Sequence, residues 1–403
     1  MKVAMLGPLP GQGAFLGGVD AVVAALVGGL AAHPEIELHV VTAVPGLKAA
    51  TKEQQRAPAS GGRGYLLHRV PHPRGDRLLW HEPVVRPLAD TVRAIDPDVV
   101  HAHMAGPYAG AALRSGRPAV ITLHGVAFRE AALAQVDAVL TGKLRWQVDA
   151  WYERWLLHQV RDLIAISPYV VQECQPLTHA RFYDIENPVA DCYFESPEPP
   201  AGAPPTLLCV ARLIPRKDIL TLIKSFGQIH AAWPDVRLEI AGQTDADPAY
   251  TATCQQLVER LQLQNAVRFL GMMRGQDLVD CYHRADVVLL TSRQETAPVV
   301  IAEAMAAGRP VVATRSGGVP FMVTAGQTGW LAEVGDVAAL AAATLVLLAD
   351  PAQRRAFGMA ARVGAEARFR LQTIVDRTLV LYAQLITERA AAARPGRLGD
   401  SHG

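Results

Sequence analysis

Short apolar runs alternate with helical patterns along both halves of the chain. These runs are continuous, whereas half-buried strands alternate apolar and polar residues, and continuity is typical of parallel strands buried on both faces of a sheet. Strands separated by helices form βαβ units, so the pattern predicts an α/β fold with doubly wound sheets. The runs are Val3–Leu6, Leu38–Val41, Leu66–Val70, Asp98–His101, Val120–His124 and Leu163–Ile166 in the first half, and Thr206–Ala211, Val236–Ala241, Val267–Leu270, Asp286–Thr291 and Val311–Thr314 in the second.

A proline-rich segment separates the two halves. Residues 195–205, "ESPEPPAGAPP", hold five prolines and no apolar periodicity, and proline fixes φ and removes a backbone donor. The segment therefore predicts a stiff linker between two Rossmann-like domains, residues 1–194 and 206–369. A long helical pattern over residues 370–390 follows the second domain, and residues 391–403 are expected to form a flexible tail.

Composition narrows the class of protein. The 403 residues are 50% hydrophobic and carry a net charge of +1, which indicates a folded protein and gives no sign of a nucleic-acid partner. The longest apolar run, Val337–Ala349, is shorter than the roughly 20 residues that span a bilayer, and it predicts a buried helix. No signal-peptide pattern begins the chain, and the five cysteines form no Cys-x-x-Cys pair, so we expect a reduced, cytoplasmic protein.

A glycine-rich stretch, "GPLPGQGAFLGGVD" (residues 7–20), joins the first predicted strand to the first predicted helix. A dinucleotide fingerprint needs Gly-x-Gly-x-x-Gly and an acid at the end of the second strand. Here Gly17 follows Gly13 one position too late, and Thr42 stands where an acid is needed, so NAD or FAD is not expected. The free N–H groups of a helix that begins near Gly18 suit an anion, and a simple flexible turn fits the glycines equally well.

The second half holds two glutamates around a predicted helix start. In "SRQETAPVVIAEAMAAGRPVVAT" (residues 292–314), Glu295 lies in a loop, Pro298 suits the first turn of a helix, and Glu303 lies inside that helix. This arrangement suits a nucleotide-sugar, because the carboxylates accept from ribose and hexose hydroxyls while the helix N-terminus faces a pyrophosphate. The alternative is a loop charge and a surface residue without a ligand.

Other candidate residues also follow predicted strands. Arg212 and Lys217 come after the strand Thr206–Ala211, where two cations suit a diphosphate leaving group, and ordinary surface charge explains them equally well. His124 ends another predicted strand, at the sheet edge where α/β proteins bind ligands. A lone histidine at that edge is more often a structural hydrogen-bonding group than a catalyst.

Together these stretches closely resemble the large retaining GT-B glycosyltransferase family (family 4-like, group 1) that transfers hexoses from nucleotide-sugars. The resemblance implies two Rossmann-like domains facing a cleft, with the donor mostly on the C-terminal domain, the acceptor mostly on the N-terminal one, and the final helix returning to the first domain. The matching stretches run in order from Met1 to about Phe369: "GGVDAVVAAL", "DVVHAHMAGP", "TLHG", "VARLIPRKD", "VRFLGMM", "ADVVLLTSRQETAPVVIAEAMAAGRPVVAT" and "GQTGWL".

The resemblance also implies a role for each site residue. Arg212 and Lys217 match the pair that neutralises the leaving diphosphate, and Glu303 matches the acid that binds the ribose. Glu295 matches the acid near the transferred sugar, and His124 matches the histidine beside the anomeric centre. The other positions expected to contact the donor are Gly17 and Gly18 in the phosphate loop, Gly242, Met273 in a base pocket lined by Leu270–Gly275, and the backbone of Thr296, Ala297, Pro298 and Val299.

The expected chemistry follows from the same resemblance. Many members have Gly-Phe-Gly after the first glutamate, where this chain has Thr296-Ala297-Pro298, so the donor preference is open and a UDP-sugar is the favoured donor. The resemblance implies retention of anomeric configuration, and no metal or other cofactor is expected, because cations already take the diphosphate role. Asp245 and Asp247 look like a metal-binding Asp-x-Asp of another glycosyltransferase fold, but we interpret Asp247-Pro248 as the start of a helix.

Two other functions fit a similar cleft. One is a sugar-nucleotide epimerase or a phosphorylase on the same fold, and the other is a non-catalytic nucleotide-sugar-binding partner of another transferase. Hydrolysis without an acceptor, phosphate-dependent turnover, or tight binding without turnover would distinguish these from glycosyl transfer.

The acceptor is expected to be a small hydroxylated molecule or a lipid-linked one. The helical stretch Gly142–Leu163 carries Trp151 and Trp155 and a basic side, which are features of a helix that lies on anionic membranes. In a doubly wound domain such a helix usually packs on the sheet with its tryptophans in the core, and three acidic residues in the stretch offset its basic charge. We therefore favour core packing and a soluble acceptor over membrane contact.

Overall fold

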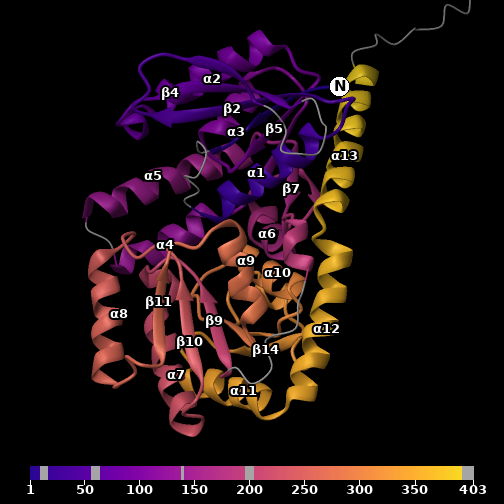
Figure 1. Ribbon diagram of the computed structural model, residues 1–403. Coiled ribbons are helices and arrows are strands. Elements are labelled where there is room, and N and C mark those ends of the chain that lie inside the picture. The colour runs from indigo at the N-terminus through magenta and orange to yellow at the C-terminus, as the bar shows by residue number, and fades with distance from the viewer. Residues whose placement is uncertain (10–16, 56–63, 138–139, 196–203, 393–403) are drawn as a thin grey trace, which may run out of the picture.

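The computed structural model describes residues 1–9, 17–55, 64–137, 140–195 and 204–392, which form two α/β halves stacked one above the other (Figure 1). Residues 10–16 of the glycine-rich stretch (7–20), most of the predicted linker (196–203) and most of the predicted tail (393–403) lie outside the described residues. Each half is built on one sheet, with helices packed on its faces.

The N-terminal half contains an eight-stranded sheet. Its strands are β1 (Lys2–Leu6), β2 (Glu37–Pro45), β3 (Thr51–Gln55), β4 (Tyr65–His72), β5 (Val99–His103), β6 (Ala119–Leu123), β7 (Asp162–Ala165) and β8 (Arg181–Asp184). Its helices are α1 (Gly18–Ala31), α2 (Glu82–Ile95), α3 (Pro107–Arg114), α4 (Ala127–Asp137), α5 (Leu140–Leu157) and α6 (Pro168–Cys174), with a short 3-10 helix, η1 (Asp76–Leu79), before α2. The strand order is β3-β4-β2-β1-β5-β6-β7-β8, in which β3 and β4 pair antiparallel and the other neighbours pair parallel.

The C-terminal half contains a six-stranded parallel sheet in the order β11-β10-β9-β12-β13-β14. Its strands are β9 (Thr206–Val210), β10 (Arg237–Ala241), β11 (Val267–Gly271), β12 (Val287–Leu290), β13 (Val311–Thr314) and β14 (Gly329–Ala332). Its helices are α7 (Ile219–Ala232), α8 (Pro248–Arg260), α9 (Gly275–Arg284), α10 (Val299–Ala306) and α11 (Val337–Ala349). The order reverses between β9 and β12, as it does between β1 and β5, and ligands of such sheets bind at the carboxyl ends of strands at this reversal.

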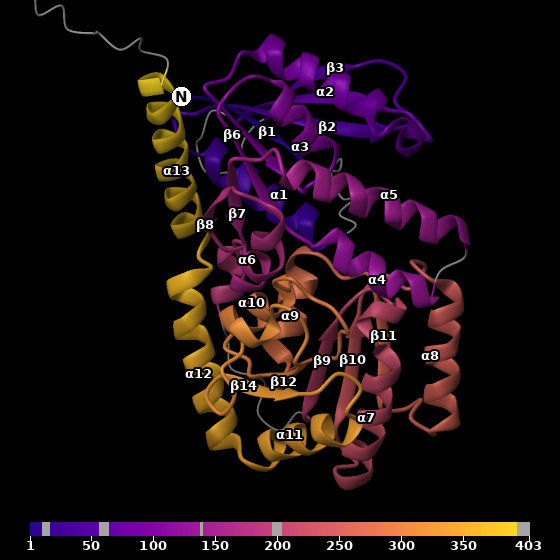
Figure 2. The same cartoon turned by 180° about the vertical axis from the view of Figure 1, so that it is seen from behind.

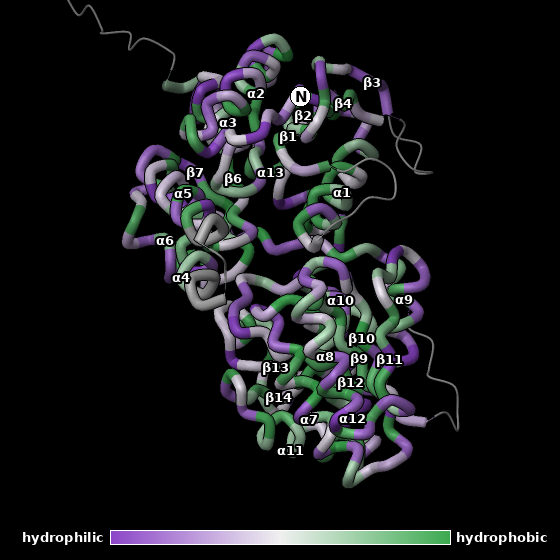
Figure 3. Tube along the Cα trace, turned by 90° about the vertical axis from the view of Figure 1, so that its left-hand side faces the viewer, coloured by the Kyte–Doolittle hydropathy of each residue, from purple (hydrophilic) through white to green (hydrophobic). Residues whose placement is uncertain are grey.

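Each sheet is buried on both faces, as the continuous apolar runs predict. Successive residues of β1 point to opposite sides, so Val3 and Met5 pack in one apolar cluster while Ala4 and Leu6 pack in another. Figure 3 shows hydrophobic residues gathered along strands in the interior of both halves. Burial of a Val, Leu or Met side chain there stabilises the fold by about 1.5–3 kcal/mol relative to leaving it exposed.

The last two helices run along one side of the molecule. Helix α12 (Pro351–Arg368) lies beside the C-terminal half and α13 (Leu371–Ala392) lies beside the N-terminal half in both views (Figures 1 and 2). Helix α13 contacts α1 and β5, and the hydroxyl of Tyr382 lies 2.6 Å from Nδ1 of His101. Among the described residues, no single helix is long and apolar enough to cross a bilayer, and α11 with α12 meets that test only as a pair bent by 104°.

The expected burial of the tryptophans in the stretch Gly142–Leu163 is wrong. Helix α5 ends at Leu157, and Trp151 and Trp155 on it are 53% and 40% exposed. The core side of α5 is formed by other residues instead, including Ala150, Tyr152 and Leu156, which are at most 2% exposed. The tryptophans are displaced to solvent because they lie on the opposite face of the helix.

Candidate functional site

Predicted site residues from separate parts of the chain meet at the reversal point of the second sheet. Arg212 and Lys217 follow β9, and Glu295 follows β12, the strand beside it. Parallel strands end at the same edge of a sheet, so their following loops lie together. The structure therefore brings the predicted cations and the first glutamate to one place.

Lys217 and Glu295 form an ion pair. Both side chains are largely buried, with exposed fractions of 14% and 7%. Burial alone would raise the pKa of Glu295, but the positive charges of Lys217 and Arg216 outweigh that effect and lower it. Glu295 is therefore ionised at neutral pH.

Arg216 adds a third cation that the sequence pattern did not single out, although it precedes Lys217 in "VARLIPRKD". Its guanidinium donates to the carbonyl of Gln294 at 3.1 Å and lies 3.8 Å from the carboxylate of Glu130 on α4. Arg212 is exposed, and its charged neighbours include Arg216, Glu130 and Glu295. Glu130, a residue of the N-terminal half, was also missed, because nothing in its local pattern distinguishes it from a solvated helix charge.

The backbone after Glu295 is held by residues of the N-terminal half. The carbonyl of Thr296 accepts a hydrogen bond from the hydroxyl of Ser167 at 2.8 Å. The carbonyl of Ala297 accepts one from the side-chain amide of Asn187 at 3.4 Å. The segment predicted to grip the sugar and phosphate thus lies where the two halves meet.

A glycine turn holds the same segment from the other side. The N–H of Gly318 donates to the carbonyl of Glu295 at 2.9 Å. A Cβ atom at Gly317 would fall 1.9 Å from the carbonyl oxygen of Glu295, and one at Gly318 would fall 1.8 Å from that of Thr296. Only glycine permits this approach of two backbones.

Helix α10 begins at the end of this segment, with Pro298 as its N-cap. Glu303 lies in the second turn of α10, and its carboxylate accepts a hydrogen bond from the hydroxyl of Tyr282 at 2.7 Å. Burial raises the pKa of Glu303 to about 7, against the effect of hydrogen bonds from Tyr282 and Tyr193. Glu303 therefore changes its ionisation near neutral pH, whereas Glu295 does not.

A second helix N-terminus lies next to α10. Gly17 is the N-cap of α1 and Gly18 its first residue, and both are exposed. A Cβ atom at Gly18 would lie 3.7 Å from a side-chain carbon of Val299, the first residue of α10. Two helix N-termini side by side, with their free N–H groups, suit a polyanion such as a diphosphate.

Gly242 and Met273 follow the neighbouring strands β10 and β11 of the same sheet. Gly242 follows β10, and a Cβ atom there would fall 1.9 Å from the carbonyl oxygen of Ala211, so the glycine lets the backbone before Arg212 approach. Met273 lies between β11 and α9 and packs, half-buried, against the apolar cluster of the C-terminal half. No hydrogen bond or ion pair described for either residue links it to Lys217 or Glu295.

Asp245 and Asp247 of the Asp-x-Asp sequence have different structural roles. Asp247 is the N-cap of α8, and its carboxylate accepts a hydrogen bond from the N–H of Tyr250 at 3.0 Å, which confirms the predicted helix start. Asp245 lines a cavity of about 540 Å³ with Thr244, Leu270 and Gly271, beside the predicted base pocket. Over the described ranges, no three His, Cys, Asp or Glu side chains are grouped to hold a metal ion.

His124 follows β6 and stands at the end of a row of histidine rings. Its Nε2 lies 2.8 Å from Nδ1 of His103, and the two rings stack with centroids 5.1 Å apart. His103 stacks in turn on His101 at 4.3 Å. Burial lowers the pKa of His124 to about 4, against a contact with Asn187, so the ring is neutral at pH 7.

His103 is a further residue that the sequence pattern did not single out. It is 1% exposed, and within the part of the chain that the structure describes its Nε2 has no hydrogen-bond partner. The available signal was its position in "DVVHAHMAGP", two residues after His101 on β5, because residues two apart on a strand share a face. His103 thereby connects His124 with Tyr382 on α13 through stacked rings.

Comparison with protein-family models gives two matches. A model described as "Glycosyl transferases group 1" matches residues 195–363, and one described as "Glycosyltransferase Family 4" matches residues 16–190. The chain is 34% identical over 301 residues to a glycogen synthase of Mycobacterium tuberculosis, which covers 72% of this chain and 70% of the relative.

Two further comparisons extend over most of the chain. It is 29% identical over 370 residues, 86% of this chain and 89% of the relative, to a GDP-mannose-dependent alpha-(1-6)-phosphatidylinositol monomannoside mannosyltransferase of Mycolicibacterium smegmatis. The structure is similar to that of a sucrose-phosphate synthase from Thermosynechococcus elongatus, with a TM-score of 0.78, 23% identity, and coverage of 96% of this chain and 99% of that one. This similarity confirms the expected GT-B fold of two Rossmann-like domains.

Proposed function

The chain belongs to the group 1 glycosyltransferases of family 4, and from this premise we propose that it transfers a hexose from a nucleotide-sugar to a hydroxyl acceptor, with retention of configuration and without a metal ion. The favoured donor is a UDP-sugar. GDP is the main rival, since the mannosyltransferase relative is named as GDP-mannose-dependent. The acceptor is a small hydroxylated or lipid-linked molecule, and the five free cysteines support a reducing, cytoplasmic location.

The observation that carries the proposal is the Lys217–Glu295 pair beside the start of α10. Glycosyl transfer passes through an oxocarbenium-like state while negative charge grows on the departing diphosphate. Lys217, with Arg212 and Arg216 nearby, and the N–H groups at the helix ends are donors held in place before that charge develops. Such a site stabilises the leaving group without a metal ion.

The two glutamates have different proposed tasks. Glu303 accepts hydrogen bonds from the ribose hydroxyls, and Glu295, ionised by its cationic neighbours, accepts from hydroxyls of the transferred hexose. His124 is neutral, so it acts as a hydrogen-bonding group beside the anomeric carbon and not as a cation.

In the proposed step, the bond from the anomeric carbon to the diphosphate oxygen breaks as the acceptor oxygen attacks from the same face. The acceptor hydroxyl proton passes to the departing diphosphate. The products are the glycoside, with its configuration retained, and the nucleoside diphosphate.

A nucleotide panel tests the proposal. UDP, GDP and ADP are added to the full chain in buffer with EDTA, and the favoured nucleotide raises the Tm by the linkage RT ln(1 + [L]/Kd). If EDTA abolishes the shift for every nucleotide, the metal-free site is wrong and Asp245 becomes the first residue to mutate.

Turnover then distinguishes transfer from its rivals. Release of nucleoside diphosphate that depends on an added acceptor, with the anomeric configuration of the product assigned by NMR, supports a retaining transferase. Release without any acceptor, or only with inorganic phosphate, contradicts it in favour of an epimerase or phosphorylase. Tight nucleotide binding with no turnover across acceptors contradicts catalysis altogether.

A further inference from the structure

Six large apolar side chains lie exposed on two elements of the N-terminal half that contact each other. They come from η1 and its end and from α5, and we name them the tryptophan patch: Leu78, Leu79, Trp80, Leu144, Trp151 and Trp155. The rings of Trp80 and Trp155 are in contact, with centroids 6.4 Å apart, which joins the two elements into one surface. Soluble domains rarely expose contiguous apolar surface of this kind unless it binds something.

The exposed face of α5 is apolar as well as its core-facing side, whereas an ordinary surface helix is polar on its exposed face. At about 100° per residue, Leu144, Trp151 and Trp155 fall within about 40° of one another. The opposite face carries Glu153, which is 2% exposed and accepts a hydrogen bond from the N–H of Phe128 at the start of α4. A helix normally turns its apolar stripe toward the core. Here a second apolar stripe faces solvent, while Glu153 lies buried among the core-facing residues of α5.

The turn that carries Leu78, Leu79 and Trp80 is held in a strained conformation. Trp80 and His81 both have positive φ, 54° and 61°, in the left-handed region that bulky side chains avoid. Leu78 in this turn is 87% exposed and does not pack into the core. A strained backbone persists only where the surrounding structure enforces it.

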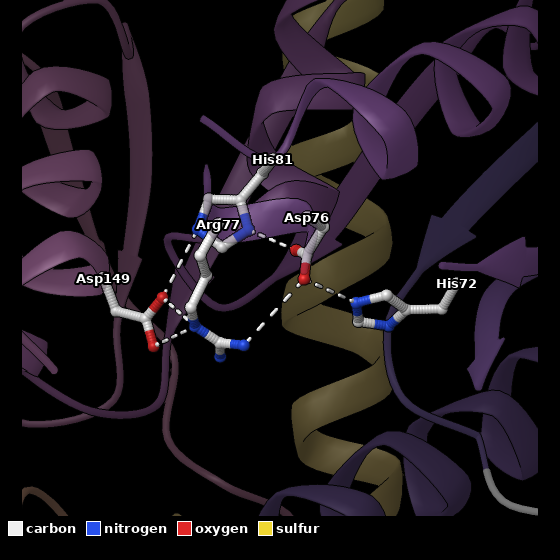
Figure 4. Close-up of polar contacts among 5 residues, drawn as sticks. All are labelled: His72, Asp76, Arg77, His81 and Asp149. Carbon is white, nitrogen blue, oxygen red and sulfur yellow. Dashed lines mark hydrogen bonds and ion pairs between the residues drawn. The ribbon is translucent and has the colours of Figure 1, made fainter. Parts of the chain in front are cut away.

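A charged network with His81 and Asp76 buried at its centre holds this turn, and Figure 4 shows the ring of His81 between two carboxylates. Nδ1 of His81 lies 2.6 Å from Asp76, and its Nε2 lies 3.3 Å from Asp149 on α5. Arg77 donates to Asp149 at 2.8 Å, and His72 lies 3.4 Å from Asp76. The network ties η1 to α5 below the tryptophan patch and keeps its two parts side by side.

The charges around the tryptophan patch are predominantly positive. Viewed along the axis of α5, at about 100° per residue, Arg145 and Arg154 lie about 80–100° to either side of the apolar stripe. Neither takes part in an ion pair described for the structured part of the chain, and the guanidinium of Arg154 lies over the ring of Phe128. The acidic residues of η1 and α5 are already bound, Asp76 and Asp149 in the network and Glu153 at α4.

We propose that the tryptophan patch docks the protein peripherally on a bilayer that contains anionic lipids. Tryptophan suits this surface because its apolar ring enters the acyl boundary while its N–H stays at the headgroups. Leu78, Leu79 and Leu144 add apolar area, and the flanking arginines pair with lipid phosphates. Helix α5 lies on the side away from α13 in both views, so neither of the last two helices covers it (Figures 1 and 2).

Flotation of the full chain with vesicles tests the proposal at physiological salt, and it does not depend on the proposed enzymatic function. The protein is expected to float with vesicles of phosphatidylcholine and phosphatidylglycerol, and at least about tenfold less with phosphatidylcholine alone. Trp151→Ala/Trp155→Ala is expected to lower the partition coefficient at least about tenfold, and Arg145→Gln about fivefold.

The matched control is Met359→Ala/Val363→Ala on α12, where the side chains are similarly exposed at 71% and 68%. This control is expected to float like the parent protein. All of these side chains are exposed, so far-UV circular dichroism is expected to be unchanged, and a change in it would disqualify a variant and call for Leu78→Ala in its place. Trp155 stacks on Tyr152 and contacts Trp80, so a lower Tm is expected for the double variant and does not disqualify it.

Three outcomes would overturn the proposal. One is failure of the parent protein to float, and another is flotation that Trp151→Ala/Trp155→Ala does not change. The third is a concentration-dependent dimer that this double variant dissociates without any vesicle binding, because the patch would then join two copies of the chain. Equal flotation on neutral and anionic vesicles would overturn the role of the arginines.

Discussion

The ammonium of Lys217 and the carboxylate of Glu295 neutralise each other at the reversal point of the second sheet. These are the cation expected to hold the leaving diphosphate and the acid expected to hold the sugar. A bound diphosphate therefore competes with the carboxylate of Glu295 for the ammonium of Lys217. The function of each residue depends on the presence of the other.

Lys217→Ala is expected to leave Glu295 buried without its main partner and to lower the free energy of unfolding by about 3 kcal/mol. Lys217→Ala/Glu295→Ala is expected to recover most of that loss, because the uncompensated charge is gone. Urea unfolding measures both. Equal stability of the single and double variants would contradict the explanation that the unpaired carboxylate of Glu295 destabilises Lys217→Ala.

Glu303→Ala is expected to weaken UDP binding about tenfold or more, since two ribose hydroxyls lose a charged acceptor. Glu295→Ala is expected not to weaken UDP binding, because it releases Lys217, but to lower kcat with the complete nucleotide-sugar. Calorimetry and steady-state kinetics separate the two effects. An equal loss of UDP affinity in both variants would contradict this division of roles.

The pKa of Glu303, about 7, predicts a pH dependence of nucleotide binding. Ribose hydroxyls donate to the ionised carboxylate, so binding lowers its pKa in the complex. Affinity is then full above about pH 7 and falls as the pH drops through that value. Glu303→Gln removes the pH dependence that comes from this carboxylate and leaves the part that comes from titration of the nucleotide itself. Plots of affinity against pH with the same shape for parent and variant would argue against a contact between Glu303 and the ribose.

His103→Ala is expected to lower kcat by about 10²-fold through misplacement of His124, with little change in the KM for the donor. His103→Asn is expected to recover part of kcat, because its amide lies where Nδ1 of the imidazole lies. A variant with unchanged kcat, or with a raised KM alone, would contradict a positioning role.

The charged network around His81 predicts how the free energy of unfolding depends on pH. Burial alone would lower the pKa of His81, but hydrogen bonds to Asp149 and Asp76 outweigh it and raise the pKa above its usual 6.5. The stabilisation from His81 is therefore complete below pH 6.5 and is lost as pH rises through the raised value. His81→Gln should differ most from the parent in Tm on the acidic side of that window, and a Tm difference that does not vary with pH would contradict a charged His81.

The carboxylates of the same network determine the low pH at which the network ceases to stabilise the fold. Burial alone would raise the pKa of Asp76 and of Asp149, but the hydrogen bonds from His81 and, for Asp149, from Arg77 lower both below 3.8. Their stabilisation is present above 3.8 and is lost as pH falls through the lowered values.

The local pattern of apolar residues was sufficient to predict most of the strands. Each of the eleven predicted runs forms a strand, because a strand buried on both faces must be apolar throughout. The three strands that were missed, β3, β8 and β14, all lie at sheet edges. An edge strand has one partner and less burial, so a polar sequence such as "TKEQQ" in β3 forms one without an apolar signal.

The site was predictable where loops follow core strands and unpredictable where partners come from the other half. Arg212, Lys217, Glu295 and Glu303 were identified from their positions after strands and in a helix start. Glu130 and Asn187 contact this region from the N-terminal half, and no spacing in the sequence relates them to it. The Lys217–Glu295 pair joins residues 78 positions apart, so it depends on the order of strands in the sheet.

The sequence by itself determined the class of fold, the order of its elements and the family, because each depends on periodicity and on contiguous stretches. Only the tertiary structure decided which charges neutralise each other and which large apolar side chains face solvent. Trp151 illustrates the difference, since the same residue on the same helix suits either a core or a surface. The physical reason is that burial is set by which face of a helix the neighbouring elements cover, and that depends on contacts between distant parts of the chain.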